Sequence, residues 1–239
     1  MIRLSASAFD VVWADLGLGR VPEPLRVRSV GHTDAERADI RAAVYANLAE
    51  RGLLPGGELD EAVVARLTTL ASASVFVECE ALADMDSDEP LRAVAAGDGS
   101  RAVLAVQPSQ TVGLSAIRPG ELCPAIVDLL PELPPGPGYG VNLPATELPS
   151  PDGASAARQR QLREVLAIQA RPVYSAGQLT VRVRENGTVA RRGGLTWFLT
   201  DVGAYFGTVA AGRGGQDWLT AGPVDAPRLT QQLADLVAP

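Results

Sequence analysis

Apolar residues recur at helical spacing in three segments near the start of the chain, and each segment predicts an amphipathic helix. The apolar positions of these segments are Phe9, Val12, Trp13 and Leu16, then Ile40, Val44 and Leu48, and then Val63, Val64, Leu67 and Leu70. Ser7 with Asp10 predicts a capping box before the first helix, and Thr33 with Glu36 predicts one before the second. Between these two helices, residues 25–28 alternate between apolar and charged side chains, which predicts a short strand.

The period of the pattern then changes from helical spacing to two, which predicts β-strands. Three segments with this alternation are residues 75–80, 102–106 and 112–116. A helix that begins near Pro119 and Glu121 closes this part of the chain. Its apolar residues are Leu122, Ile126, Leu129 and Leu130.

Residues 131–151 contain seven prolines and three glycines, and we expect them to form an extended connection. A further helix follows the connection, and its apolar positions are Leu162, Val165 and Leu166. Residues 179–184 alternate as a strand, and Asn186-Gly187 after them predicts a tight hairpin, because both central positions of a type I′ turn need positive φ. Two or three more strands and a helix over residues 225–237 complete the pattern.

The two halves of the chain share an order of helices, an antiparallel meander and a final helix. The residues that introduce the final helix, and one leucine within it, recur at a constant offset: Pro119, Glu121 and Leu129 correspond to Pro223, Asp225 and Leu233. Hairpins place strands antiparallel, since parallel neighbours would need a crossover between them. The sequence therefore predicts a single α+β domain over residues 1–239, in which two pseudo-symmetric halves, residues 1–130 and 152–239, share one antiparallel sheet.

Composition narrows the classes of function. The chain has 239 residues, a net charge of -7 and a sequence pI near 4.8, which argues against binding to duplex nucleic acid. All 21 basic residues are arginine, so the chain lacks the lysine of a Walker loop, of a pyridoxal Schiff base and of a lysine general base. No stretch approaches the roughly 20 apolar residues of a membrane span. The N-terminus lacks the apolar core of a signal peptide, and we expect a cytoplasmic protein.

Few residues support catalysis or metal binding. His32 is the only histidine, and its place just before a predicted helix cap indicates a solvent-facing turn residue. A single histidine excludes the common multi-histidine zinc sites, and no G-x-S-x-G elbow is present. The carboxylates of residues 84–89 fail the calcium-loop pattern, since Glu89 stands where glycine is needed. The spacing of Cys79 and Cys123 fits neither a disulfide framework nor a zinc knuckle, and we expect buried thiols.

Two pairs of charged residues keep an alternative open. Glu78 and Glu80 lie on one face of their predicted strand, about 7 Å apart at the strand rise, a spacing that could hold an acid and a base. Arg182 and Arg184 lie on one face of another predicted strand. A small-molecule-binding domain or an enzyme could use these four as pocket residues. Solvated strand faces, with charges that prevent aggregation, would explain them as well.

The order of several turn and cap residues resembles the EspG family, the chaperones of the ESX (type VII) secretion systems of actinobacteria. In the first half the matching residues are Leu25-Arg26-Val27, Gly31, Thr33, Glu36-Arg37 and Arg51-Gly52-Leu53. In the second half they are Trp197, Asp201, Gly203, Tyr205, Trp218-Leu219-Thr220 and Pro223-Val224-Asp225. The similarity spans nearly the whole chain. One departure is the tight turn at residues 107–110, where some members have a long loop.

The resemblance implies a quasi-two-fold fold, in which a central antiparallel sheet carries a helical bundle from each half. It also implies a non-enzymatic role without a cofactor. EspG proteins bind cytosolic PE-PPE heterodimers at the hydrophobic tip of the PPE helical hairpin, keep them soluble and present them to the ESX secretion machinery in the membrane. The implied partners are therefore proteins, with no nucleic acid and no direct insertion into the membrane.

Such a chaperone needs an exposed, partly apolar surface with a polar rim. The alternation around Trp197 predicts one side of that strand as a core face and the other side as a half-wet contact face. The predicted partner-binding face consists of Val112 and Leu114 on one strand, Thr196, Phe198 and Thr200 on another, and Gln231 and Gln232 of the terminal helix as the rim. Two alternatives remain: several of these residues pack beneath helices, or the apolar strand faces join two copies of the chain.

Overall fold

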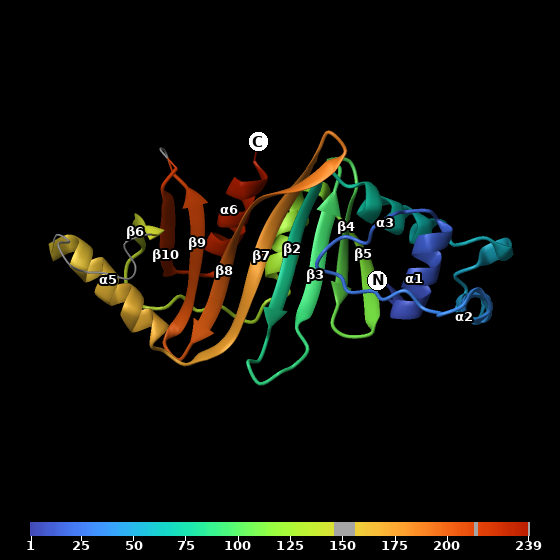
Figure 1. Cartoon of the computed structure of the whole chain (residues 1–239), viewed down its shortest axis with the longest axis horizontal. Coiled ribbons are helices and arrows are strands. Elements are labelled where there is room, and N and C mark those ends of the chain that lie inside the picture. The colour runs from blue at the N-terminus through green and yellow to red at the C-terminus, as the bar shows by residue number, and fades with distance from the viewer. Residues whose placement is uncertain (146–155, 213–214, 239) are drawn as a thin grey trace. The chain divides into compact units, whose positions relative to one another are not determined.

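Ten strands form one large antiparallel sheet in the computed structural model, which describes residues 1–145, 156–212 and 215–238 (Figure 1). The elements up to residue 127 are β1 (Ile2–Ser5), α1 (Ala6–Asp15), α2 (Asp34–Glu50), the 3-10 turn η1 (Pro55–Gly57), α3 (Glu61–Ser72), β2 (Val75–Leu82), β3 (Leu91–Gly97), β4 (Ala102–Gln107), β5 (Thr111–Ile117), the 3-10 turn η2 (Pro119–Glu121) and α4 (Leu122–Val127). The later elements are β6 (Val141–Pro144), α5 (Ala156–Gln169), β7 (Val173–Glu185), β8 (Thr188–Thr200), β9 (Gly203–Ala211), β10 (Asp217–Pro223) and α6 (Ala226–Val237). The antiparallel sheet with separate helices confirms the predicted α+β class.

Each half of the chain orders its five strands in the same way. The order of hydrogen-bonded neighbours is β1-β5-β4-β3-β2 in the first half and β6-β10-β9-β8-β7 in the second. In both halves the first strand therefore pairs with the last, as Ile2 does with Leu114 and Leu143 with Leu219. A helix then follows the last strand, α4 in one half and α6 in the other. This repetition confirms the predicted pseudo-symmetry. The half boundaries at residues 130 and 152 stay a prediction.

The chain also divides into two compact units, which differ from the two halves. Unit 1 comprises Met1–Cys79, Leu91–Ile126 and Arg182–Ala190, and unit 2 comprises Glu80–Pro90, Val127–Val181 and Arg191–Pro239. Three strands, β2, β7 and β8, contribute residues to both units. None of the helices in the described ranges is long and apolar enough to span a bilayer.

The core of unit 1 forms where α1 and α3 pack on β5. The rings of Phe9 and Trp13 stack with their centres 5.2 Å apart, and both side chains are buried together with Leu67 of α3. Val112 and Leu114 of β5 belong to the same buried cluster. Burying one large apolar side chain contributes roughly 1.5–3 kcal/mol, so this cluster is a main source of stability for unit 1.

Polar residues cap the helices of unit 1, and one of the two predicted capping boxes is confirmed. Thr33 and Glu36 form the predicted capping box of α2. The box predicted at Ser7 is wrong, because α1 starts earlier. Ser5 is the cap, and its hydroxyl oxygen accepts a hydrogen bond from the backbone N–H of Ala8 at 3.1 Å.

Residues 25–28 form no strand, so the predicted short strand is wrong. The backbone of Arg26 bonds to a side chain, that of Gln107, and not to the backbone of a neighbouring strand. The side-chain oxygen of Gln107 accepts a hydrogen bond from Arg26 N at 2.7 Å, and its amide nitrogen donates to Arg26 O at 2.9 Å. Gln107 is itself buried at the end of β4, so this pair of bonds fixes the segment on unit 1.

The two clearest local signals of the second half are confirmed. Asn186 and Gly187 both have positive φ, at 49° and 80°, in the turn that joins β7 to β8. Asp225 caps α6 by accepting a hydrogen bond from the backbone N–H of Arg228 at 2.8 Å. One face of α6 carries the fully buried Leu229 and Leu233, as its helical spacing requires.

The proline- and glycine-rich connection contains a strand that the sequence pattern did not predict. This strand, β6, pairs with β10, and its residues Val141 and Leu143 pack with Val165 of α5. Gly136 lies against the ring of Tyr205, where a β-carbon would clash with the ring. The connection is therefore packed into unit 2 through at least two of its segments.

Candidate partner-binding cleft

A cleft of about 720 Å³ opens in unit 2. Strands β2, β7 and β8 each contribute three consecutive residues to its lining, 80–82, 176–178 and 196–198. The loop after β2 supplies the rest: Met85, Ser87, Asp88 and Pro90. A hydrogen bond of 3.0 Å from Met85 N to Tyr174 O ties this loop to the start of β7.

The lining combines exposed apolar groups with polar ones. Met85 is 45% exposed, Thr196 is exposed and Phe198 is half-buried. The Phe198 ring stacks on Tyr205 with the ring centres 5.8 Å apart, which fixes its orientation. Polar groups come from Glu80, Ser87, Asp88 and Gln178. A mixture of apolar and polar groups is the usual composition of a protein interface.

Trp197, the middle one of the three β8 residues that line the cleft, is fully buried. Its indole ring lies beside Gly177 of β7, where an added β-carbon would be 2.7 Å from the indole nitrogen. Within the described ranges, Trp197 Nε1 and Ser175 Oγ are buried without a hydrogen-bond partner, and each such group costs about 1–3 kcal/mol. Close packing on Gly177, and not hydrogen bonding, therefore holds this ring.

The structure brings two of the seven predicted partner-binding residues, Thr196 and Phe198, into the cleft. Val112 and Leu114 are fully buried in unit 1, so their predicted place on an exposed face is wrong. The physical reason is that α1 and α3 pack on β5 and cover these side chains.

The other three predicted residues lie outside the cleft lining. Thr200 is buried, and its hydroxyl donates a hydrogen bond of 2.8 Å to Gly203 O, which closes the turn between β8 and β9. Gln231 is exposed on α6, where its amide donates to Asp235 at 2.8 Å, and Gln232 is half-buried. Their predicted role as a rim stays a prediction.

Sequence reasoning missed the contributions of the β2–β3 loop and of β7. Met85 stands between Asp84 and Asp86 in an exposed loop, and an apolar side chain in such an acidic segment is a signal for a contact residue. Gly177 in the middle of a strand is a second signal, because glycine there marks a close approach of another group.

The four charged residues of the alternative hypothesis divide between two hollows. Glu78 is buried in unit 1, where Arg182 Nε donates to its carboxylate at 3.0 Å. Glu80 lines the cleft of unit 2. The predicted pair of an acid and a base is therefore not assembled in either hollow. Arg184 donates to Ala71 O, near the end of α3, at 2.8 Å.

The stability of the protein should depend on pH through Glu78. Burial raises the pKa of its carboxyl from 4.5 to about 7, although Arg182 opposes the shift. The folded state therefore holds the proton more tightly than the unfolded state between these values, and stability falls as the pH rises through this window. We expect the free energy of unfolding to be about 2 kcal/mol higher near pH 5 than near pH 8 on this account.

Urea unfolding of the wild type and of Glu78→Gln at several pH values tests this dependence. The amide of the variant does not titrate. If Glu78 had its ordinary pKa, the difference in free energy of unfolding between the two proteins would therefore not change between pH 5 and pH 8. A pH profile that is the same for both proteins would contradict the raised pKa.

The other ionisable or reactive side chains that the sequence pointed to lie in structural positions. His32 is exposed before α2, and Cys79 and Cys123 are buried thiols, as predicted. Asp84 accepts a hydrogen bond from Asp86 N at 2.9 Å, which is a local turn contact. Among the described residues, no group of three histidine, cysteine, aspartate or glutamate side chains could hold a metal ion.

Comparisons with known proteins agree with the fold. The model of the EspG family matches residues 5–235 of the chain. Among solved structures, the type VII secretion system chaperone EspG5 of Mycobacterium tuberculosis, in complex with a PE25-PPE41 dimer, superposes with a TM-score of 0.75 at 17% sequence identity. The alignment covers 99% of this chain and 95% of that one. A comparison with functionally curated proteins finds no match.

Proposed function

Because the chain belongs to the EspG family, we propose that it is a chaperone of a type VII secretion system, which binds a PE-PPE heterodimer in the cytosol, keeps it soluble and directs it to the secretion machinery. The observation that carries the proposal is the family match over residues 5–235, and the complex of EspG5 with PE25-PPE41 supports it. The task needs binding and no bond chemistry, and we assign no catalytic residue.

The cleft of unit 2 is the proposed contact surface for the apolar tip of the PPE hairpin. Covering Met85 and Phe198 with apolar groups of the partner would remove their exposed area from water. This burial favours binding by roughly 25 cal/mol for each Å² of apolar surface. The exposed hydroxyl of Thr196 also lines the cleft and can accept a hydrogen bond from a polar group of the partner. The Thr196 hydroxyl donates its hydrogen to Gly207 O at 3.2 Å, and its oxygen can still accept a hydrogen bond.

The loop beside the cleft sets the charge that a partner meets. Asp84, Asp86, Asp88 and Glu89 all lie in its exposed stretch. A field of one sign at an interface raises the rate of association with a partner of the opposite sign, and salt screens it. The favoured substrate therefore carries basic or neutral polar residues beside its apolar tip.

Co-expression with the PE-PPE pair encoded nearest to this gene tests the proposed function. We expect affinity capture to yield a complex with one copy of each chain, measured by size-exclusion chromatography with light scattering. The pair should be soluble only when the chaperone is present. Folded chaperone that captures none of the cognate PE-PPE pairs would overturn the proposal.

Met85→Arg and Thr196→Arg test the cleft. A guanidinium placed in an apolar contact must be desolvated without a partner, so each variant should weaken capture by about tenfold or more. Val209→Arg is the matched control, because Val209 is 55% exposed on β9 and lies outside the cleft lining. All three variants should melt close to the wild type. Equal capture by all three would place the contact surface elsewhere.

A further inference from the structure

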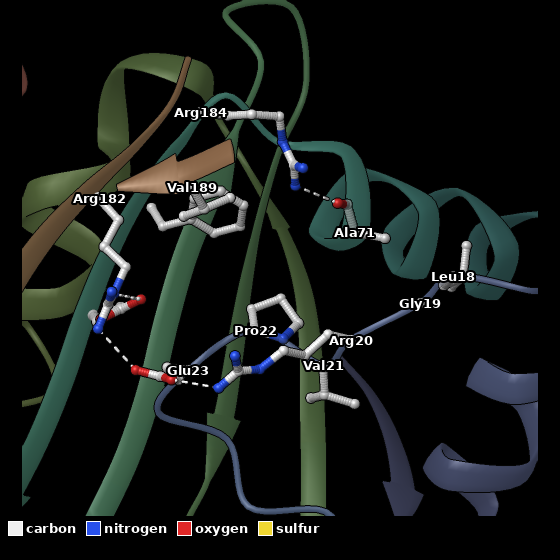
Figure 2. A pocket seen from close by; sticks show the side chains of 12 residues that line it. Leu18, Gly19, Arg20, Val21, Pro22, Glu23, Ala71, Arg182, Arg184 and Val189 are labelled. Carbon is white, nitrogen blue, oxygen red and sulfur yellow. Dashed lines mark hydrogen bonds and ion pairs between the residues drawn. The ribbon is translucent and has the colours of Figure 1, made fainter. Parts of the chain in front are cut away.

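A pocket of about 380 Å³ lies within unit 1 (Figure 2). Its walls are the segment after α1, the end of α3, strand β2 and the two strand ends at the β7–β8 hairpin. Its apolar lining comes from Leu18, Val21, Pro22, Ala71, Phe76 and Val189. A half-closed apolar hollow of this size accepts a small molecule.

A chain of ion pairs crosses one side of this pocket. Arg182 contacts two carboxylates, with Nε 3.0 Å from Glu78 and Nη2 2.7 Å from Glu23. The other oxygen of Glu23 lies 2.8 Å from Arg20. Figure 2 shows Glu23 between the two guanidinium groups. Glu23 is about half exposed and Arg20 is 84% exposed, so the Arg20 end of this series of ion pairs lies at the mouth of the pocket, in contact with solvent.

Arg184 closes another side of the pocket. Its Nε and Nη2 donate to Ala73 O and Ala71 O, at 2.9 and 2.8 Å, and its guanidinium carbon lies 5.8 Å from the centre of the Phe76 ring. The hydrogen bonds of Arg182 and Arg184 thus use Nε and Nη2 of each guanidinium. Within the described residues, Nη1 of both makes no hydrogen bond.

The charges of the pocket do not balance. Its lining contains three arginines, at positions 20, 182 and 184, and two glutamates, at positions 23 and 78. One positive charge is therefore in excess when both carboxylates are ionised. Buried ionic groups contribute little net stability to a fold, and a cluster of them at a pocket is typical of a binding site.

We propose that this pocket binds a small molecule with an apolar body and a single carboxylate. The apolar body replaces water against Phe76 and Val189, and the carboxylate neutralises the excess charge. A hydrogen bond from a guanidinium N–H to a carboxylate is charge-assisted, and it is roughly twice as strong as one to a neutral polar group. The volume lies near the lower end of the range for ligand pockets, which favours a small ligand. This site lies in unit 1, and it shares no lining residue with the cleft proposed for partner binding in unit 2.

Binding of the carboxylate should be linked to a proton. The charged groups that face the site are Arg20, Glu23, Glu78, Arg182 and Arg184. Burial already raises the pKa of Glu78 to about 7, and a second negative charge nearby favours its protonated form further. A proton is then taken up on binding, so affinity rises as the pH falls from about 8 to about 6.

Saturation-transfer NMR with 3-phenylpropanoate tests the proposal, with the neutral 3-phenylpropanamide as the matched ligand. We expect the acid to bind the wild type about tenfold more tightly than the amide. Its affinity should increase about threefold from pH 8 to pH 6, while Glu78→Gln should show no such increase. Equal transfer to the acid and the amide, or no transfer to either, would overturn the proposal.

A pair of arginine variants separates the pocket from general surface charge. Arg20→Gln should weaken binding of the acid about threefold, because it removes an exposed charge at the mouth of the pocket. Arg118→Gln is the control: Arg118 is 86% exposed and pairs with Glu121 at 3.1 Å with the same sequence spacing, but it does not line the pocket.

Val189→Phe should fill the hollow and abolish binding. Equal affinity in the wild type, Arg20→Gln and Val189→Phe would contradict the assigned site. Capture of a PE-PPE pair should stay unchanged in these variants, so either proposal can fail without the other.

Discussion

Replacing Arg182 with methionine is expected to destabilise the protein by about 3–5 kcal/mol, because a buried carboxylate then loses its counter-ion. The side chain of Glu78 is 8% exposed, and Arg182 is the group that donates to it at 3.0 Å. Methionine keeps the apolar stem of the arginine and removes the charge and the donors. The measurement is the free energy of unfolding in urea near pH 8, where Glu78 is ionised.

A second variant separates the loss of charge from the loss of packing. Glu78→Gln removes the unpaired charge, so the double variant with Arg182→Met should regain most of the lost stability. Glu23→Gln should cost less than about 1 kcal/mol, because Glu23 is 49% exposed and solvent can replace its partner. If Arg182→Met costs as much in the Glu78→Gln background as in the wild type, packing and not the ion pair explains its effect.

Adding one methyl group at Gly177 is expected to destabilise unit 2 by about 1–3 kcal/mol or more, through overpacking. The new β-carbon of Gly177→Ala would lie 2.7 Å from the β-carbon of Ala81 and 2.7 Å from Trp197 Nε1. Trp197 is fully buried, so a shift of its rigid ring would disturb the side chains packed around it. Thermal and urea unfolding of the variant measure the loss.

Gly207→Ala provides a matched control for this effect. Gly207 also lies within a strand of unit 2, but the nearest neighbour of its β-carbon would be Thr196 Oγ1 at 3.6 Å, an ordinary contact. Its cost should stay below about 1 kcal/mol. Equal stability of the two variants would show that the strands at Gly177 can separate to admit a side chain.

Local patterns predicted much of the fold where local physics decides it. The spacing of apolar residues located α1, α2, α3 and α6, and Asn186-Gly187 located the β7–β8 turn from the need for positive φ. Strand β3 was missed because Ala93, Val94, Ala95 and Ala96 are all fully buried, so no polar face alternates with an apolar one. Strand β6 was missed because its strand partner, β10, comes far later in the chain and the prolines around it favour loops.

The candidate site could be predicted only in part. Alternation along β8 identified Thr196 and Phe198, because their face depends on the strand period alone. The same reasoning failed for Val112 and Leu114, since the period gives two faces and does not say which one a helix covers. The contribution of Met85 depends on a loop whose position follows from tertiary contacts, such as its bond to Tyr174 O.

The pairing of the first strand with the last has a consequence for how the protein is made. Ile2 pairs with Leu114, so β1 leaves the ribosome without its partner and waits until β5 has been synthesised. The second half repeats the delay, since β6 must wait for β10. Contacts this distant in sequence slow folding and leave strand edges open meanwhile. A protein proposed to protect others from aggregation therefore passes through a nascent stage in which it needs protection itself.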